Sequence, residues 1–380
     1  MFGRRLFTGC GLAGLLVLAG CGSFFSNGTS GGGSGSTVAS YAYVGTQTGV
    51  LASYSVSSTG ALAGLSGSPL QLATAAITGL AVNPANSFLY TGVSGVGIFG
   101  LSINSTTGVP SLINTSALAT DVDPSALAVD PAGTHLLVAG IANGVPAVGE
   151  YNINSDGTLS PMTGSPVTIG LPSGSNVANA LITNISVAPN SSFVFVTLGQ
   201  LGVALMPFTT TGTLSANTSV VTPKTSGNVS NQDLGVAVNP GSTLLFVGET
   251  NAGIRVFTIA ANFPEVSGSP FAAGGQPRSI VLDGAGDRLY AANTTDSTIS
   301  GYAVAASGTL TPLAGSPYSS VGPQPYWLTL DKSQTFLLDA NLGGSPNVQL
   351  FSFDATTVGK LDPGATVTNL TTASVVVSTH

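Results

Sequence analysis

Seven polar side chains in this sequence are spaced so that they could surround one small ligand. Each stands at or just before a repeated apolar strand pattern, and together they are Asp121, Asp123, Asp233, Gln276, Arg278, Gln324 and Tyr326. One arginine among carboxylates, amides and a phenol predicts a polar funnel that binds a small molecule through hydrogen bonds. Oxygen ligands of this kind would also suit a calcium ion. The alternative is a water-filled opening in which Arg278 is paired with an acid.

Other common catalytic centres lack their residues, since the chain has only two histidines and two cysteines. His135 is expected at the start of a strand and His380 ends the chain, so neither is placed beside a nucleophile for Ser-His-Asp catalysis. Cys10 and Cys21 lie in an N-terminal segment that we expect to be processed, which leaves no thiolate set for zinc. We therefore expect no cofactor and no metal apart from the calcium option.

The elements that would position these side chains are visible as internal repeats. An apolar–small–apolar triplet followed by a turn, here named strand A, occurs six times, at residues 80–84, 127–131, 185–189, 236–240, 280–283 and 328–331. A strand B follows each turn, a strand C carries a bulky residue near its end, and a weaker strand D often ends in Gly-Ser-Pro. The A copies recur every 44 to 58 residues. This period is typical of four-stranded propeller blades.

The repeats also predict a closed ring. Strands B and C occur seven times, with a first B copy at Tyr41–Thr46, but strand A occurs only six times before the end of the chain. Ser374–Val377 fits the missing copy, so we expect it to pair into the first blade. The predicted fold is an all-β, seven-bladed β-propeller of four-stranded blades over residues 39–380. An outer-membrane barrel or a β-helix fits less well, because barrel strands are longer and β-helix repeats are shorter.

This architecture sorts the polar residues onto two faces. In a propeller the D-to-A and B-to-C connections share the face around the central mouth, and the seven candidate residues fall there. The A-to-B turns share the opposite face, where Asp130, Asp283 and Asp331 read as residues that cap their own turns. Only the first group is therefore expected to form a site.

The composition excludes several kinds of partner. Only 6% of residues are charged while 43% are hydrophobic, so the chain is expected to be folded rather than disordered. There are 15 acidic against 8 basic residues, and loss of Arg4 and Arg5 with a signal segment would leave 15 against 6, a net charge of −9. Such a surface argues against nucleic acid and against anionic lipid as partners. We expect a monomer.

The first residues have the features of an export signal. Arg4 and Arg5 precede a short apolar stretch, and Leu18-Ala19-Gly20-Cys21 resembles the lipobox of bacterial lipoproteins. The resemblance implies cleavage after residue 20, lipidation of Cys21 and membrane attachment through that lipid. Residues 21–38 would form a tether rich in glycine and serine. No Asp follows Cys21, so we expect the outer membrane of the cell envelope rather than the inner membrane.

The blade repeats, with their Gly-Ser-Pro endings at Gly67, Gly164, Gly268 and Gly315, resemble the seven-bladed lactonase-like propellers, a family that includes 6-phosphogluconolactonases. The resemblance covers the chain from about Tyr41 onward. That family often has a Pro-Arg-His step entering an A strand, and this chain reads Pro277-Arg278-Ser279 there. The histidine is absent, and a phosphorylated lactone would need more cations than one arginine.

We therefore expect an envelope-anchored module that binds a protein, glycan or small molecule at its mouth or rim, without catalysis. The alternative implied by the resemblance is a lactonase-type hydrolase. In that case Asp121, Asp123 or Asp233 would activate water, and Arg278 would stabilise the oxyanion.

Overall fold

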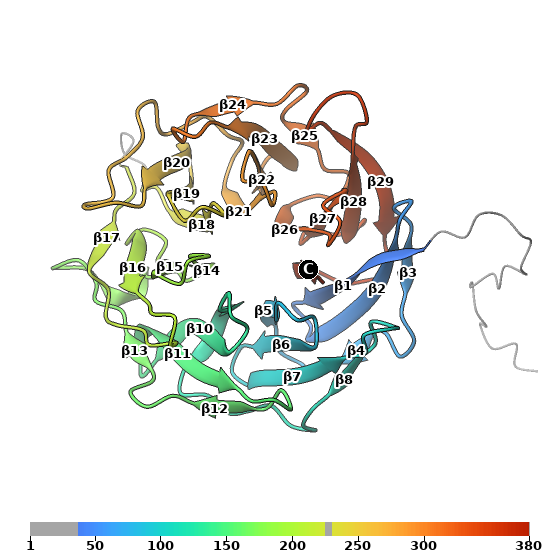
Figure 1. The fold of residues 1–380 in the computed structure, drawn as a ribbon, viewed down its shortest axis with the longest axis horizontal. Coiled ribbons are helices and arrows are strands. Elements are labelled where there is room, and N and C mark those ends of the chain that lie inside the picture. Colours follow the sequence, from blue (N-terminus) through green and yellow to red (C-terminus); the bar gives the residue numbers. More distant parts are fainter. Residues whose placement is uncertain (1–36, 225–229, 380) are drawn as a thin grey trace, which may run out of the picture. The chain divides into compact units, whose positions relative to one another are not determined.

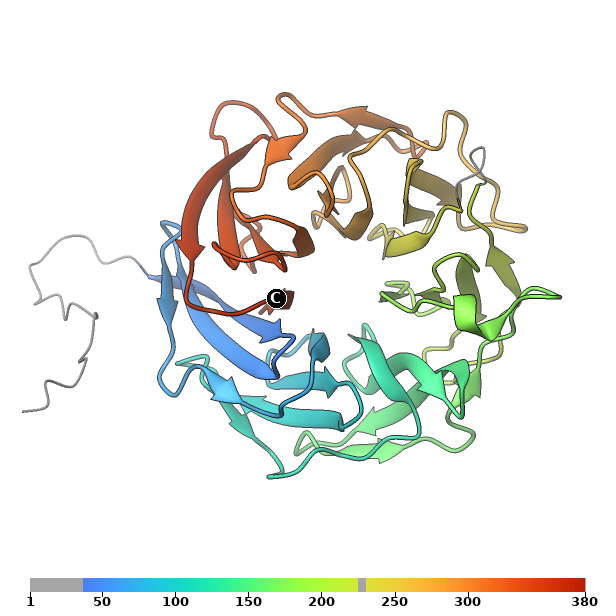
Figure 2. The same cartoon turned by 180° about the vertical axis from the view of Figure 1, so that it is seen from behind.

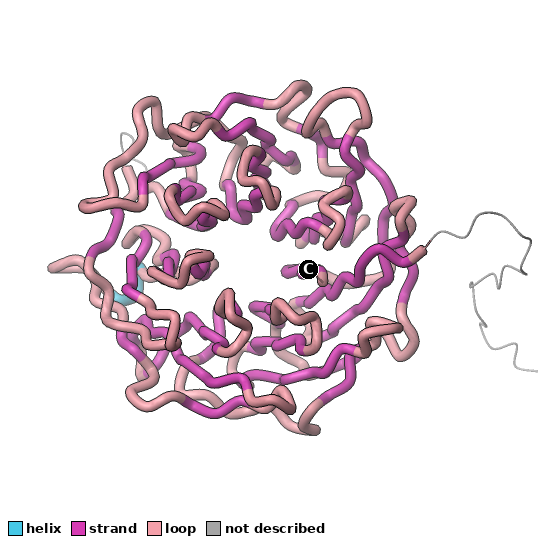
Figure 3. The backbone as a smooth tube through the Cα atoms, in the orientation of Figure 1, coloured by secondary structure: helices cyan, strands magenta, loops and turns pink. Residues whose placement is uncertain are grey.

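The computed structural model describes residues 37–224 and 230–379 of the chain. Seven antiparallel sheets surround a central axis, which confirms the predicted seven-bladed β-propeller (Figures 1 and 3). The predicted signal segment 1–20, Cys21 and most of the tether lie outside the described residues. The first strand begins at Val38, one residue before the predicted start of the propeller. In the described part of the chain, no helix combines the length and apolar character needed to cross a membrane.

Blades 1 to 3 come from residues 38–168 and from the C-terminal strand, and the innermost strand is named first in each. Blade 1 contains β30 (Ala373–Ser378), β1 (Val38–Thr46), β2 (Val50–Ser57), β3 (Leu62–Gly64) and β4 (Leu70–Gln71). Blade 2 contains β5 (Ile77–Val82), β6 (Phe88–Val93), β7 (Gly97–Ile103) and β8 (Pro110–Leu112). Blade 3 contains β9 (Asp123–Val129), β10 (His135–Ala142), β11 (Val145–Ile153), β12 (Leu159–Pro161) and β13 (Val167–Thr168).

Blades 4 to 7 complete the ring. Blade 4 follows the short 3₁₀ helix η1 (Val177–Asn179) and contains β14 (Ile185–Val187), β15 (Phe193–Thr197), β16 (Val203–Pro207) and β17 (Ser219–Val221). Blade 5 contains β18 (Asp233–Val238), β19 (Leu244–Glu249) and β20 (Gly253–Thr258). Blade 6 contains β21 (Pro277–Leu282), β22 (Arg288–Asn293), β23 (Thr298–Val304), β24 (Leu310–Pro312) and β25 (Tyr318–Ser319). Blade 7 contains β26 (Pro325–Leu330), β27 (Phe336–Asn341), β28 (Val348–Phe353) and β29 (Leu361–Val367).

The ring is closed by the C-terminal strand, as the repeats predicted. β30 pairs antiparallel with β1, with Val376 opposite Val44 and Val375 opposite Gly45. It therefore serves as the inner strand of blade 1, between the inner strands β26 and β5 (Figures 1 and 2). Pairing of the two chain ends within one sheet protects what would otherwise be an open edge.

Apolar side chains fill the spaces between blades. Among the described residues the buried apolar side chains form seven clusters, and each cluster joins two adjacent blades. Because every second side chain of a strand points to the same face of its sheet, each blade buries both of its faces. The inner strands are consequently held by the packing of their blades.

Buried tyrosines add a polar link between adjacent blades. The same position of three B strands carries a tyrosine whose hydroxyl donates to a glycine carbonyl of the next blade, at 2.7 Å for Tyr43 to Gly108, 3.0 Å for Tyr90 to Gly157 and 2.7 Å for Tyr290 to Gly359. Burial raises the pKa of all three phenols, so they remain protonated donors.

Blade 5 departs from the predicted four strands. Its sheet has three strands, and the outer position is held by two single bridges, Ile254 to Phe271 and Phe257 to Glu265. Pro264 and Pro270 interrupt this outer segment, and proline cannot donate a ladder hydrogen bond. The outer edge of blade 5 is therefore held in part by polar side chains.

Candidate functional site

The inner strands share a β-bulge near the mouth of the ring. In six of them the register with the second strand shifts by one residue, and the extra residues are Ser374, Thr78, Ser125, Leu234, Arg278 and Tyr326. A bulge re-aims its extra side chain out of the normal strand alternation. All of these except Leu234 line one cavity of about 170 Å³. The mouth cavity is thus built from one equivalent position repeated around the ring.

The mouth cavity has a single charged group among its described lining residues. The other contributors are neutral, and the polar or aromatic ones outside the bulges are Gln47, Ser94, Thr183 and Trp327. No carboxylate and no histidine belong to this lining. Arg278 therefore sets the charge of the cavity, and the cavity favours an anion or the oxygen of a polarised carbonyl.

Three of the hydroxyls around the cavity already donate to the backbone. Ser374 donates to the carbonyl of Ile77 at 3.1 Å, and Thr78 donates to the carbonyl of Pro124 at 2.7 Å. Thr183 likewise donates to the carbonyl of Leu234 at 2.6 Å. Each of these hydrogen bonds joins an inner strand, or the segment that leads into it, to the next blade. Because their protons are used in this way, these hydroxyls can only accept a hydrogen bond from a ligand.

Arg278 and Tyr326 break this pattern. The Arg278 guanidinium carbon lies 3.9 Å from the centre of the Tyr326 ring, so the tyrosine holds the cation in place by a cation–π contact. No carboxylate pairs with Arg278 among the described residues, and its buried Nε has no hydrogen-bond partner. Burial lowers the pKa of Arg278, with Tyr326 opposing that shift. The sequence alternative in which Arg278 is paired with an acid is therefore not observed.

The whole ring matches one protein family. The family model described as lactonase, seven-bladed beta-propeller, matches residues 41–378. The chain belongs to this lactonase family. No curated protein sequence matches it significantly.

Solved structures share the fold of this lactonase-family chain. A protein from Lactobacillus plantarum is 21% identical with a TM-score of 0.69, over 90% of this chain and 99% of that chain. A candidate 6-phosphogluconolactonase from Bacteroides uniformis is 18% identical with a TM-score of 0.69, over 89% and 98%. The periplasmic gluconolactonase of Pseudomonas aeruginosa is 17% identical with a TM-score of 0.63, over 90% and 99%. At these identities the likeness shows the fold alone.

Ser279 occupies the place where the lactonase resemblance implied a histidine. Its side chain is buried, and its hydroxyl oxygen accepts a hydrogen bond from the backbone N–H of Leu328 at 3.0 Å. Ser279 therefore links blades 6 and 7, and it does not line the mouth cavity. The first two residues of the family's Pro-Arg-His motif are present as Pro277 and Arg278, and Arg278 is the extra residue of the bulge.

Asp121 and Asp123 lie in a different recess of the lactonase-family ring. Both line a space of about 400 Å³ beside β7 and β9, outside the mouth cavity. Asp123 accepts a hydrogen bond from the backbone N–H of Gly95 at 2.7 Å. The structure thus separates these carboxylates from Arg278, although their neighbour Ser125 reaches the mouth cavity.

Asp233 is placed inside the protein instead of at the mouth. It pairs with Glu249 across β18 and β19, at the position that Ile77, Pro277 and Pro325 occupy in other blades. Its side chain is fully buried, and neither carboxylate oxygen has a hydrogen-bond partner. Burial raises the pKa of Asp233 well above its usual range, with Glu249 adding to the rise and Arg255 opposing it.

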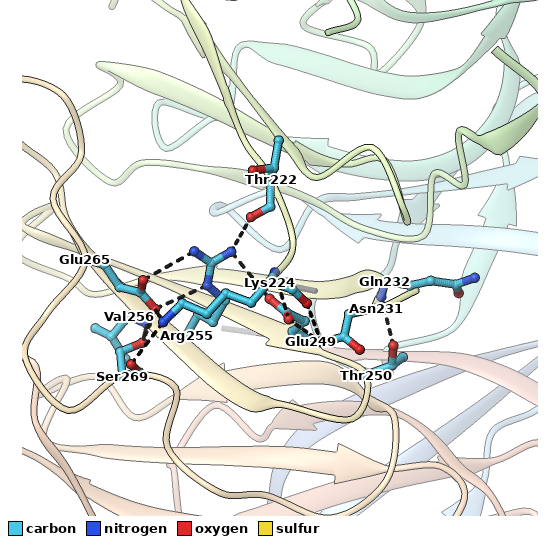
Figure 4. A network of polar contacts seen from close by, with 10 residues as sticks. All are labelled: Thr222, Lys224, Asn231, Gln232, Glu249, Thr250, Arg255, Val256, Glu265 and Ser269. Atoms are coloured by element: carbon cyan, nitrogen blue, oxygen red, sulfur yellow. Dashed lines mark hydrogen bonds and ion pairs between the residues drawn. The ribbon is translucent and has the colours of Figure 1, made fainter. Parts of the chain in front are cut away.

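A buried polar network lies beside Asp233 and supports the short blade 5 (Figure 4). Arg255 pairs with Glu249 at 3.4 Å and with Glu265 at 3.2 Å, and it donates to the carbonyl of Thr222. Lys224 pairs with Glu265 at 3.0 Å. These contacts tie the approach to β18 to the outer edge of blade 5, so the network reads as structural.

Gln276 and Gln324 act through their backbones. Both have positive φ values, 55° and 58°, and their carbonyls accept hydrogen bonds from Thr294 and Leu342. Their side chains are exposed on the rim and do not line the mouth cavity. They shape the approach to Arg278 and Tyr326.

No metal centre is evident in the described ranges. No three His, Cys, Asp or Glu side chains are grouped there to hold a metal ion. The lining of the mouth cavity offers no carboxylate to calcium, the ion that the sequence left open.

Sequence reasoning missed the neutral half of the mouth, namely Gln47, Thr78, Ser94, Ser125, Thr183 and Ser374. A usable signal was present for three of these residues. Thr78, Ser125 and Ser374 stand at the same repeat position as Arg278 and Tyr326, two residues before the small or apolar centre of the A strand, where the register with the B strand shifts.

Proposed function

We propose that the mouth of this lactonase-family propeller binds a neutral lactone and catalyses its hydrolysis. The observation that carries the proposal is Arg278, a half-buried cation in the mouth cavity that pairs with no carboxylate in the part of the chain that the structure describes. Burial without compensation is unfavourable for a guanidinium, and an oxygen that becomes negatively charged would relieve it. Family membership supports lactone chemistry at this position.

The proposed reaction uses this cation at the carbonyl. Water adds to the lactone carbonyl carbon, and the ring C–O bond then breaks to give the open hydroxy acid. Arg278 donates N–H groups to the carbonyl oxygen, where negative charge develops as water adds. Tyr326 keeps the guanidinium from swinging away, because its ring lies against the cation at 3.9 Å.

The cavity favours a neutral substrate over a phosphorylated one. A phosphate monoester carries nearly two negative charges at neutral pH. Arg278 is the single charged group among the described residues of the cavity wall. Because Arg278 is needed at the lactone carbonyl, the described cavity wall has no second cation to bind a phosphate.

A second candidate is ligand binding without catalysis, the function that the sequence favoured. The observation in its favour is that no carboxylate or histidine lines the mouth cavity, so no common general base is at hand. Under this candidate, Arg278 would hold a carboxylate of a small molecule or of a partner.

Acid release from a panel of neutral and phosphorylated lactones separates the candidates. We expect turnover of neutral lactones, and Arg278→Gln should lower kcat/KM by about 100-fold or more, as loss of one oxyanion donor does elsewhere. Arg288→Gln is the matched control, because Arg288 pairs with Asp283 and Asp287 on the opposite face. Its kinetics should equal those of the wild type.

The other outcomes are equally informative. If no lactone is turned over but the hydroxy acids bind to wild type and not to Arg278→Gln, the binding candidate stands alone. Equal turnover by wild type and Arg278→Gln would overturn the role given to the mouth cavity.

We further propose that the propeller is attached to the outer membrane through a lipid on Cys21. The support is the lipobox-like sequence Leu18–Cys21 after Arg4 and Arg5, with no Asp after the cysteine. Metabolic labelling with a fatty-acid analogue should mark the wild type and leave Cys21→Ser unlabelled. Label on the serine variant would contradict this assignment.

A further inference from the structure

Two cavities meet in the central channel of the ring, and one side chain contacts both of them. The mouth cavity measures about 170 Å³. A wider cavity of about 620 Å³ lies toward the opposite opening, beside the inner strands β14, β18, β21 and β26. Among the described lining residues, Trp327 is the one that belongs to both cavities. Its indole therefore lies at the boundary between them.

The boundary is at the same level on neighbouring inner strands. On β21, Arg278 lines the mouth cavity and the next residue, Ser279, lines the wider cavity. Before β14, Thr183 lines the mouth cavity and Asn184 lines the wider one. Trp327 is the side chain that occupies this level of the channel.

Trp327 stands at a repeat position that is small in most other blades. It is the first residue after the bulge that pairs with the second strand of its blade. The equivalent residues in blades 1, 2, 3, 5 and 6 are Val375, Gly79, Ala126, Gly235 and Ser279. Among these six inner strands, Trp327 is thus the single aromatic side chain at this position.

The residue at this position is small because the inner strand of the next blade lies close to it. A Cβ atom on Gly79 would lie 2.9 Å from the backbone nitrogen of Leu127 in blade 3. A Cβ atom on Gly235 would lie 2.7 Å from the carbonyl oxygen of Arg278 in blade 6. An indole does not fit between two inner strands at such distances, so the Trp327 ring is displaced toward the channel.

The packing of Trp327 agrees with this direction. Its side chain is half-buried and packs against two apolar clusters, one between blades 7 and 1 and one between blades 1 and 2. These clusters lie on the two faces of blade 1, so the indole lies across the inner edge of β30. The remainder of the ring is exposed to the two cavities.

We propose that Trp327 forms the floor of the mouth cavity and determines which lactones the mouth accepts. This inference rests on the proposed lactone hydrolysis, and Trp327 itself takes no part in the reaction. Arg278 and Tyr326 are the bulge residues on the mouth side of Trp327. A lactone substituent that points from Arg278 away from the opening therefore meets the indole.

The volume of the mouth limits what fits above this floor. In another protein, an apolar cavity of about 150 Å³ holds one benzene ring. A mouth cavity of about 170 Å³ is therefore expected to accept a single lactone ring with a short substituent. Without the indole, the mouth cavity would open into the wider cavity of about 620 Å³, and a longer substituent could enter.

The test compares two lactones that have the same ring and different chains. γ-Valerolactone carries a methyl group, and γ-decalactone carries a hexyl group. We expect the wild type to favour γ-valerolactone at least about tenfold in kcat/KM, because even one methylene group can change kcat/KM by about this factor in a pocket. In Trp327→Ala, the ratio of kcat/KM for γ-decalactone to that for γ-valerolactone should rise at least about tenfold.

Two further variants separate this role from a loss of folding. Trp327→Leu keeps an apolar side chain at the floor and should shift the ratio in the same direction by a smaller factor. Phe353→Ala removes another half-buried aromatic side chain of blade 7, one that lines neither cavity, and should keep the wild-type ratio. Thermal melting establishes that each variant is folded before its kinetics are compared.

Two results would overturn the role of Trp327 and leave the proposed hydrolysis standing. One is an equal kcat/KM of the wild type for the two lactones, which would show that long substituents leave through the opening. The other is an unchanged ratio in whichever of Trp327→Ala and Trp327→Leu is folded. Turnover of neither lactone by the wild type would instead overturn the proposed hydrolysis, and this inference with it.

Discussion

The fully buried carboxyl of Asp339 in β27 should make the free energy of unfolding depend on pH. Ser320 donates to its Oδ2 at 2.7 Å and the Asn341 amide nitrogen donates at 3.1 Å, while Oδ1 has no hydrogen-bond partner. Burial raises the pKa of Asp339 to about 7, and these two hydrogen bonds only partly offset the rise. In the unfolded chain the same group titrates near its usual value of about 3.9.

The sign of the pH effect follows from this difference. Below pH 4 Asp339 is protonated in both states, so it adds no pH dependence. Between about pH 4 and 7 only the folded state keeps the proton, so stability falls as pH rises, by about 1.4 kcal/mol per unit. From pH 5 to pH 8 the loss should reach about 3 kcal/mol.

Asp339→Asn should remove this loss, because an amide does not titrate. The free energy of unfolding, measured in urea at pH 5 and pH 8, should fall about 3 kcal/mol further in the wild type than in Asp339→Asn. Asp121→Asn is the control at an exposed site and should follow the wild type. Parallel pH dependence in the wild type and Asp339→Asn would contradict the protonated state assigned to Asp339.

The sequence predicted the positions of some mouth residues and not of others. Repeat alignment placed Arg278 and Tyr326 together at the mouth, because both occupy one position of the repeat. Repeat alignment also predicted Asp233 at the mouth, and this was wrong. The extra residue of the bulge in β18 is the next one, Leu234, and Asp233 is buried. A side chain's direction at a bulge depends on pairing with the neighbouring strand, which one segment of sequence does not reveal.

At the scale of secondary-structure elements, β30 closes the ring by pairing with β1. Val376 is fully buried opposite Val44, and it packs among side chains of blades 1 and 7. The order of the strands and the positions of the A and B strands followed from the sequence, since the turn and apolar signals recur in every blade. The outer edge of blade 5 did not, because polar contacts of Arg255 and Glu265 replace a regular strand there.

Val376→Asp should therefore destabilise the whole propeller. An unpaired carboxylate in this position should cost at least about 3 kcal/mol, because it removes apolar burial and places a charge in the core. Val358→Asp makes the same chemical change at a side chain that is 69% exposed, and it should cost less than about 0.5 kcal/mol. Equal losses of unfolding free energy in urea would show that β30 does not close the ring.

At the scale of the whole molecule, the ring presents two openings with different chemistry. The mouth holds Arg278, which pairs with no carboxylate of the described residues, among neutral polar groups. The cavity at the opposite opening, of about 620 Å³, has Asp283, Asp331 and Lys332 in its wall. Five of the seven inner strands contribute one residue to the mouth through their bulges, namely β30, β5, β9, β21 and β26. One position of the repeat thereby supplies both Arg278 and Tyr326 to the mouth.

The central claim is that Arg278 receives the reacting end of a lactone. The most direct test is a crystal structure of the protein with the open hydroxy acid of its preferred lactone. We expect the carboxylate within about 3 Å of the Arg278 guanidinium, above Tyr326, in the mouth cavity. A hydroxy acid bound elsewhere on the ring, with Arg278 left uncontacted, would contradict it.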